Sequence, residues 1–404
     1  MESTQVQNIF WDYIFVGGGL AASVVSHRLH QFDPTLKILV VEAGLNANDR
    51  SDIVWPSSTN LAGGDFDWKD KSVNQPNLDG RSIDLPGGKA LGRGIVINGD
   101  ANGGNTLGVA ELQENRKDGR RQIAAAVYPL DGITVLTDTM VEKVLIDDAV
   151  GDEGGRVAVG VWLVNGGEIR ARETIIAAGA RDVGQNLADH GLFFHAWKVK
   201  DPSAGWALGS PNPIFNEPQY GWEFPFDLIV ASDVAKEGPA AAIVEDEGIV
   251  LDPDTHPLLV HKRAFFEHVF IDAPLIDPNF LGTAVDRYVV RGAVKTLIRF
   301  AGSNATVVGR EILDGEAGAP GIDEVLSTNS SDEYIDARIR AGLGTSYHPM
   351  GTVTMGKVVD TALRVKGVNN LRVVDASVFP VAITGHLQAA VYALAEQADH
   401  GKLA

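Results

Sequence analysis

The sequence has no cysteine and is poor in positive charge. Its 404 residues include no Cys, which excludes disulfides, thiolate metal sites and catalytic thiols. Lys and Arg number 34 against 53 Asp and Glu, and the net charge of −19 argues against a surface that attracts nucleic acid or anionic lipid. No stretch approaches the roughly 18 apolar residues of a membrane span, and residues 1–8 lack the features of a signal peptide. We therefore expect a cytoplasmic protein with no nucleic-acid or membrane partner and with a bound cofactor for any redox step.

Glycine, in contrast, is abundant at 45 residues, and three of these follow an apolar segment near the start. Residues 13–16 and 37–42 predict two short buried strands, and residues 20–29 between them have helical composition. A strand, a glycine turn, a helix and a second strand form a βαβ unit, whose two strands are parallel. The predicted fold class is therefore α/β, with a Rossmann-type nucleotide-binding domain.

The glycine turn has the spacing of a dinucleotide-binding fingerprint. Gly17 is placed to make the tight turn, Gly19 to let a pyrophosphate approach the backbone, and Ala22 to keep helix and strand close. Glu42 ends the second strand at the position where a carboxylate can hold a ribose hydroxyl. A solvated strand end is the alternative role for Glu42. With the glycines present, we predict an adenosine diphosphate moiety, of FAD or NAD rather than NADP.

The other elements are predicted from periodicity and composition. Residues 49–115 are expected to form a long ordered loop, and residues 200–290 an irregular second lobe. A strand meander that returns to the first sheet is expected from residues 133–148, 156–164 and 173–179. Three helices and one strand complete the prediction: residues 288–301, 331–340 and 386–398, and residues 371–375.

Motifs along the whole chain resemble those of the glucose-methanol-choline (GMC) family of FAD-dependent oxidoreductases, and most closely its fungal members of small-molecule metabolism. Several motifs in the same order are more specific than any one of them. They are residues 13–23 (YIFVGGGLAAS), 40–44 (VVEAG), 87–99 (GGKALGRGIVING), 141–146 (VEKVLI), 175–180 (IIAAGA), 183–190 (VGQNLADH), 346–352 (SYHPMGT), 371–380 (LRVVDASVFP) and 385–389 (GHLQA).

The resemblance implies a bound FAD and a division into two domains. Residues 92–99 contain no histidine, so the FAD is expected to be non-covalent. Residues 1–190 with 340–404 would form the discontinuous FAD-binding domain, and residues 191–339 a truncated α+β substrate-binding domain. The positions that match the family's cofactor-binding residues are Gly17, Gly19, Leu20, Glu42, Ala43, Gly92, Asn98, Val141, Asp375, Ala376 and Gln388.

The resemblance also makes His348 and His386 the active-site pair. Oxidation of a small-molecule alcohol at its CH–OH group removes the hydroxyl proton as hydride leaves for flavin N5, and an imidazole with a pKa near 6.5 can accept that proton. His386 would hold the alkoxide by a hydrogen bond, and dioxygen or another acceptor would reoxidise the flavin. Read singly, His348 is a loop histidine and His386 an exposed residue before a helix.

No metal site is predicted. His190 and His195 are five residues apart, but no third ligand has a supporting spacing, so ordinary packing is the expected role of both. The acidic run at residues 245–247 is expected to be a solvated turn.

The chain departs from the family pattern at two junctions. The family's long segment of flavin lid and substrate-domain helices is missing after Asp100, and its second signature is missing after Ala180. These losses leave two alternatives to an alcohol oxidase or dehydrogenase: a flavin-bearing lyase on the same scaffold, or a non-catalytic FAD-binding remnant.

Overall fold

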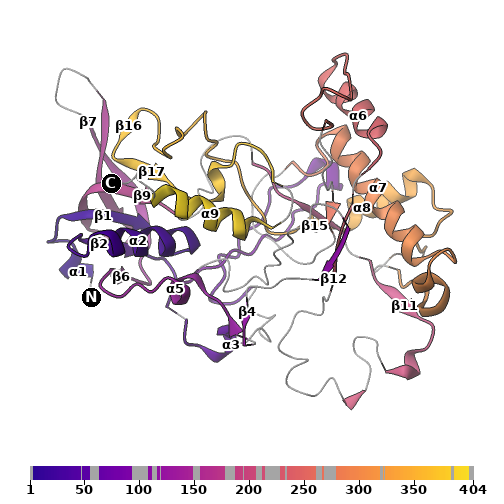
Figure 1. Cartoon of the computed structure of the whole chain (residues 1–404), viewed down its shortest axis with the longest axis horizontal. Helices are drawn as coiled ribbons and strands as arrows, with labels where there is room; N and C mark the ends of the chain where they lie inside the picture. The colour runs from indigo at the N-terminus through magenta and orange to yellow at the C-terminus, as the bar shows by residue number, and fades with distance from the viewer. Residues whose placement is uncertain are drawn as a thin grey trace.

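The computed structural model has a sheet-containing body at one end and a lobe of helices at the other (Figure 1). It describes residues 3–46, 48–54, 63–92, 108–111, 116–118, 120–148, 155–177, 187–193, 195–205, 212–213, 228–232, 234–260, 266–267, 279–318, 322, 324–383 and 386–399. Both junctions at which the chain departs from the family pattern lie outside these ranges.

A parallel sheet forms the centre of the body. Strand β1 (Trp11–Val16) lies between β2 (Ile38–Val41) and β9 (Glu168–Ile176), β6 (Thr134–Leu136) extends the sheet beyond β2, and β17 (Leu371–Val373) pairs with β9. All these pairings are parallel, so the carboxyl ends of the strands meet at one edge. The strand order changes direction at β1, which is where doubly wound sheets bind their ligands. The predicted Rossmann-type α/β fold is confirmed.

An antiparallel meander is attached to the same sheet. Strand β7 (Val141–Asp148) pairs with β8 (Arg156–Leu163), and β8 pairs with the first part of β9. The second part of β9 then pairs with β1 and β17. The short strand β16 (Val368–Asn369) lies parallel to β8. The structure thus confirms the predicted meander and its return to the first sheet.

Two helices from opposite ends of the sequence pack together on the sheet (Figure 1). Helix α2 (Leu20–Phe32) and helix α9 (Leu387–Asp399) share one apolar core with β1, β2 and β17. An ion pair of 2.8 Å between Arg28 and Glu396 joins the two helices at their surface. Burial of the apolar faces stabilises this packing, because each buried Val or Leu side chain contributes about 1.5–3 kcal/mol.

The second lobe is built around helices α6 (Glu237–Glu247), α7 (Ala284–Ala301) and α8 (Asp332–Gly342). The helices predicted at residues 288–301 and 331–340 are thus present, and α7 begins four residues earlier than predicted. Thr283 and Asp286 form a capping box at the start of α7, and the Ser331 hydroxyl caps α8. Helix α6 corrects the prediction of an irregular segment. Its run at residues 245–247 is helical rather than a turn, and Asp246 accepts hydrogen bonds from the first N–H groups of α7.

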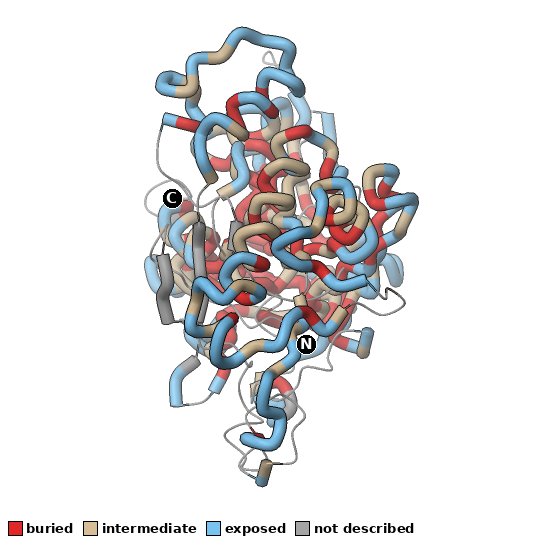
Figure 2. Tube along the Cα trace, turned by 90° about the vertical axis from the view of Figure 1, so that its right-hand side faces the viewer, coloured by how far each residue is buried: buried red, intermediate tan, exposed pale blue. Residues whose placement is uncertain are grey.

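The core of the second lobe also contains residues from the first half of the chain. Leu78, Ile83 and Leu85 pack with Val294 of α7 and Ile335 of α8. The predicted division at residue 190 stays a prediction. Figure 2 shows buried residues mostly in the interior of the trace and exposed residues mostly along its outside.

The remaining elements are short. A two-stranded pairing joins β10 (Gly191–Phe193) to β15 (Leu343–Thr345), and the predicted loop of residues 49–115 contains β3 (Gly108–Glu111), which pairs with β12 (Leu228–Ser232). Within the described ranges, no helix combines the length and apolar character needed to cross a membrane. The other elements are α1 (Ser3–Val6), α3 (Ser51–Val54), η1 (Pro76–Leu78), β4 (Arg116–Lys117), β5 (Arg120–Arg121), α5 (Ala124–Val127), β11 (Trp197–Val199), η2 (Pro202–Ala204), β13 (Phe266–Glu267), η5 (Val308–Ile312), β14 (Leu313–Glu316) and η6 (Ala376–Val378).

Candidate active site

The glycine turn lies at the carboxyl edge of the sheet, directly after β1. Gly17 has a φ of 92°, a left-handed conformation that side chains disfavour, and its N–H donates to the Val41 carbonyl at 2.8 Å. Gly19 is the N-cap residue of α2, and no side chain caps the helix there. Leu20 begins the helix and is half-buried. The turn therefore leaves the positive end of α2 at the edge where a phosphate is predicted to bind.

Glu42 is buried and holds the backbone on both sides of it. One carboxylate oxygen accepts from the N–H of Gly18 at 2.6 Å, and the other accepts from the N–H of Gly44 at 2.7 Å. Ala43 lies between these contacts, half-buried. A carboxylate oxygen has a second lone pair, so Glu42 can still accept from a hydroxyl. Its role toward a ribose stays a prediction.

Residues 89–92 pack closely against this turn. The N–H of Gly92 donates to the Gly18 carbonyl at 2.8 Å, and the N–H of Leu91 donates to the Leu45 carbonyl at 3.0 Å. The approach requires glycine at position 44, because a Cβ there would lie 2.1 Å from the Lys89 carbonyl oxygen. Asn98, which was predicted to line the flavin with Gly92, lies outside the described residues.

The start of the meander lies beside Glu42. Two backbone hydrogen bonds join the loops, from Thr139 N–H to the Glu42 carbonyl at 3.0 Å and from Asp138 N–H to the Gly44 carbonyl at 2.9 Å. They bring Val141, at the start of β7, near the glycine turn. The predicted adenine contact of Val141 is compatible with this position and remains untested.

Asp375 and Ala376 connect the sheet edge to the histidines. Asp375 follows β17, is buried, and caps η6 by accepting from the N–H of Ser377 at 2.9 Å. The Ala376 carbonyl accepts from Gly351 N–H at 3.3 Å, and the Ser377 carbonyl accepts from Val353 N–H at 2.8 Å. The loop that carries His348 is thereby tied to the carboxyl edge of the sheet.

The structure brings the two predicted catalytic histidines together. Their ring centroids lie 4.6 Å apart with planes at 74°. His348 is buried, and its Nε2 has no hydrogen-bond partner among the residues that the structure describes. Burial lowers the pKa of His348 well below 6.5, and the nearby His386 and His190 lower it further. His348 is therefore neutral near pH 7, the state required of a base.

Asp189, which the sequence prediction did not include, holds the backbone around His348. Its Oδ1 accepts from the N–H groups of His190 at 2.8 Å and His348 at 2.9 Å, and Oδ2 accepts from the Thr345 hydroxyl. Tyr347 adopts a φ of 65° between these contacts. Burial raises the pKa of Asp189 to about 6 despite these hydrogen bonds. Asp189 and His190 end the motif at residues 183–190, and this motif was the sequence signal that could have indicated their role. The spacing of His190 from His195 did not reveal it.

His190 corrects the prediction that it serves ordinary packing. Its Nδ1 lies 2.8 Å from Nδ1 of His348, and its Nε2 lies 3.0 Å from the Ile383 carbonyl oxygen. His195 packs against the rings of Phe193 and Trp197, as predicted, and its Nδ1 also lies 3.6 Å from Oε1 of the buried Glu316. In the described part of the chain, no group of three or more His, Asp or Glu side chains has the arrangement of a metal site.

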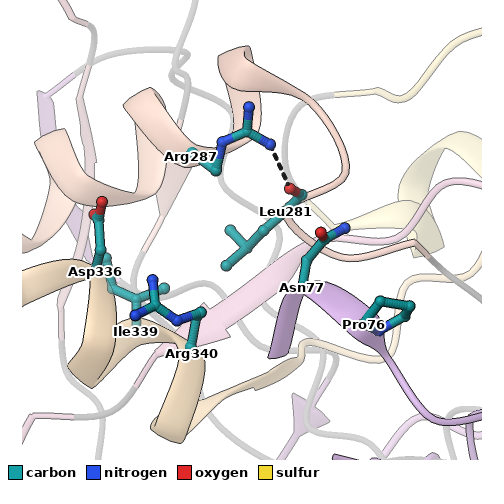
Figure 3. Close-up of a pocket in the computed structure, with 7 residues that line it drawn as sticks. All are labelled: Pro76, Asn77, Leu281, Arg287, Asp336, Ile339 and Arg340. Atoms are coloured by element: carbon teal, nitrogen blue, oxygen red, sulfur yellow. Dashed lines mark hydrogen bonds between the residues drawn. The ribbon is translucent and has the colours of Figure 1, made fainter. Parts of the chain in front are cut away.

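A separate cavity of about 370 Å³ lies in the second lobe (Figure 3). It lies between α7, α8 and η1, and Arg287 donates to the Leu281 carbonyl at its edge. The residues that line it are Pro76, Asn77, Leu281, Arg287, Asp336, Ile339 and Arg340. None of these is a predicted site residue, so the histidine cluster rather than this cavity is the candidate active site.

Comparisons with known proteins agree with the geometry. A family model described as GMC oxidoreductase matches residues 271–395. The GMC-type oxidoreductase acuG of Aspergillus aculeatus is 31% identical over 377 residues, which cover 75% of this chain and 69% of that protein. The formate oxidase structure from Aspergillus oryzae covers 98% of this chain and 100% of its own, with a TM-score of 0.78 at 18% identity, a likeness of fold.

The fold and the family comparisons define a flavin-dependent oxidoreductase scaffold. The chain belongs to the GMC oxidoreductase family, and FAD is the cofactor of this family. An alcohol dehydrogenase [acceptor] of Pseudomonas putida is 26% identical over 546 aligned positions that cover 96% of this chain and 95% of that protein. The chain has only 404 residues, so at least 142 of those positions belong to the relative alone. The comparison agrees with the internal shortening inferred from the motifs.

Buried polar atoms near the predicted residues fit a bound FAD. Gln388 is buried in the first turn of α9, and neither its amide nitrogen nor its amide oxygen has a partner among the described residues. The same holds for Oδ1 of Asn48, which lies 3.7 Å from where a Cβ on Gly92 would be. Unpaired buried amides are costly, and a ligand with hydrogen-bonding groups would satisfy them.

Proposed function

We propose that the protein oxidises the CH–OH group of a small-molecule alcohol, with His348 as the base and His386 as the hydrogen-bonding partner of the substrate oxygen. The observation that carries the proposal is the buried Nε2 of His348, which has no partner among the described residues and lies beside the His386 ring. FAD, when bound without a covalent link, supplies the acceptor for the hydride of the alcohol, and dioxygen or another acceptor takes the electrons afterwards.

The residues of the chain would divide the work between cofactor binding and proton transfer. Gly17, Gly19 and Glu42 would hold the adenosine half, and Asp375 and Gln388 the part nearer the histidines. Nε2 of His348 would accept the hydroxyl proton, because its low pKa leaves it unprotonated at neutral pH. Burial of the site would strengthen the hydrogen bond from His386 to the developing alkoxide, because little water competes for it.

The test is anaerobic reduction of the FAD-loaded protein by benzyl alcohol, choline and 1-hexanol. The reaction is monitored through the loss of flavin absorbance. We expect at least one alcohol to bleach the flavin, and His348→Ala to slow that step by about 10²–10⁴-fold with unchanged FAD content. A protein that binds FAD and is bleached by no alcohol would refute the activity. It would favour the non-catalytic FAD-binding remnant, which the 142 or more positions absent relative to the Pseudomonas putida protein support as the second candidate.

A further inference from the structure

The histidine cluster contains a third ring whose two nitrogens both have partners. His190 reaches Nδ1 of His348 at 2.8 Å with its own Nδ1, and the Ile383 carbonyl oxygen at 3.0 Å with its Nε2. It is held opposite His348 by two antiparallel segments: Ser346 N–H donates to the His190 carbonyl at 2.9 Å, and Ala188 forms a bridge with Met350. This placement makes His190 the direct neighbour of the proposed base.

The donor and acceptor roles follow from the Ile383 carbonyl. A carbonyl oxygen can only accept, so Nε2 of His190 must carry a proton. A neutral imidazole has one N–H, which leaves Nδ1 of His190 as an acceptor. The proton between the two Nδ1 atoms must then belong to His348. If His348 is neutral as well, its Nε2 has a free lone pair, and this is the buried atom without a partner in the described structure.

Ser346 agrees with the same assignment. Its hydroxyl donates to the His190 carbonyl at 3.1 Å, which leaves the hydroxyl oxygen free to accept. That oxygen lies 3.3 Å from Nδ1 of His348, within reach of the same N–H. Two acceptors thus surround Nδ1 of His348, and both favour the tautomer in which Nε2 is bare.

We propose that His190 is a positioning residue that fixes the tautomer of His348, so that Nε2 is the basic atom. This inference rests on the proposed function, in which His348 is the base. His190 also binds the carbonyl of Ile383, close before His386 in the chain, and so holds the backbone leading to the second histidine. Without the acceptors at Nδ1, of which His190 is the nearer, His348 would be free to carry its proton on Nε2, where it could not accept one from an alcohol.

The test uses two substitutions that each keep half of the His190 contacts. In His190→Asn the amide oxygen replaces Nδ1 and can still accept from His348. In His190→Gln the amide reaches the position of Nε2 and can donate to the Ile383 carbonyl, and Ser346→Ala is added to both variants so that the Gln variant presents no acceptor to Nδ1 of His348. The readout is the ¹⁵N spectrum of imidazole-labelled protein without FAD, in which the His348 signals are assigned from their loss in His348→Gln.

We expect the Nδ1–H tautomer of His348 in the wild type and in His190→Asn, and the Nε2–H tautomer in His190→Gln. With FAD loaded, flavin reduction by the alcohol that bleaches best should slow about 10–100-fold in His190→Gln, with KM changed less than threefold, and should recover to within about fivefold of wild type in His190→Asn. An Nε2–H tautomer in the wild type, or no tautomer change in His190→Gln, would overturn the inference. A correct tautomer pattern without bleaching by any alcohol would overturn only the proposed function.

Discussion

Replacing Gly44 by Ala should separate the carboxyl edge of the sheet from residues 89–92, which pack on it. The added Cβ would lie 2.1 Å from the Lys89 carbonyl oxygen, 2.2 Å from its carbonyl carbon and 2.5 Å from the Ala90 nitrogen. These are backbone atoms, so no side chain can rotate away. Contacts below 3.0 Å are essentially never made by real Cβ atoms, and the two segments must therefore move apart by about 0.9 Å.

The magnitude follows from the interactions that this movement disturbs. The hydrogen bonds from Leu91 to Leu45 and from Gly44 to Glu42 lie next to the clash. Their loss would cost about 0.5–1.5 kcal/mol each, and the overpacking about 1–3 kcal/mol. We expect a loss of roughly 2–6 kcal/mol in unfolding free energy, together with a weaker hold on FAD, because the clash bears directly on the backbone that positions Glu42.

The assay is thermal unfolding followed by circular dichroism, with FAD content measured from the flavin released on denaturation. Gly155→Ala is the matched control, since the nearest atom to its added Cβ is the Asn369 side-chain nitrogen at 3.8 Å. The control should keep the wild-type midpoint and FAD content. If Gly44→Ala behaves like Gly155→Ala in both measurements, the close approach of residues 89–92 to Gly44 contributes neither to stability nor to FAD binding, and the reasoning is refuted.

Three further predictions concern a buried ion pair, the pKa of His348 and a helix cap. Arg338→Met should lower the unfolding free energy by about 3–5 kcal/mol, since it leaves the buried Glu316 carboxylate without its arginine partner. Arg364→Met, which breaks a surface ion pair, should cost about 0–1 kcal/mol, and equal losses of the two variants in urea titrations would contradict this. Flavin reduction should fall only as the pH drops below 6.5, because burial lowers the pKa of His348 and the neutral imidazole is the active form; a half-maximal rate above pH 6.5 would refute the assignment. Thr283→Ala should cost about 0.5–2 kcal/mol through loss of the capping box, and an unchanged thermal midpoint would count against that cap.

Local sequence signals were sufficient for the first half of the nucleotide-binding fold. The apolar run before Gly17 and the helical composition after it predicted β1 and α2, which the structure places at residues 11–16 and 20–32. The same held for α7, α8 and α9, which the structure places at residues 284–301, 332–342 and 387–399. Helix α6 was missed because its 11 residues contain a Gly and a Pro and show only a weak apolar stripe.

Interactions over long sequence distances explain what remained hidden. Leu78, Ile83 and Leu85 belong to the core of the second lobe, although they come from the segment predicted as a loop of the first domain. In the sequence, Asp246 was predicted to be one of three solvated acidic residues in a turn. In the structure, it accepts hydrogen bonds from two backbone N–H groups at the start of α7. In both cases the partner lies far away in the sequence, so no local pattern could indicate the contact.

By itself, the sequence determined the Rossmann-type class, the family resemblance, and His348 and His386 as the pair to examine. These inferences depend on short motifs, in which composition and spacing express local backbone requirements. Only the tertiary structure decided that His190 faces His348 and that Asp189 ties their two backbones together, because these residues are separated by 158 and 159 positions, respectively, from their partner. The protonated nitrogen of an imidazole depends on what surrounds each ring atom, and those surroundings exist only once the two segments have come together.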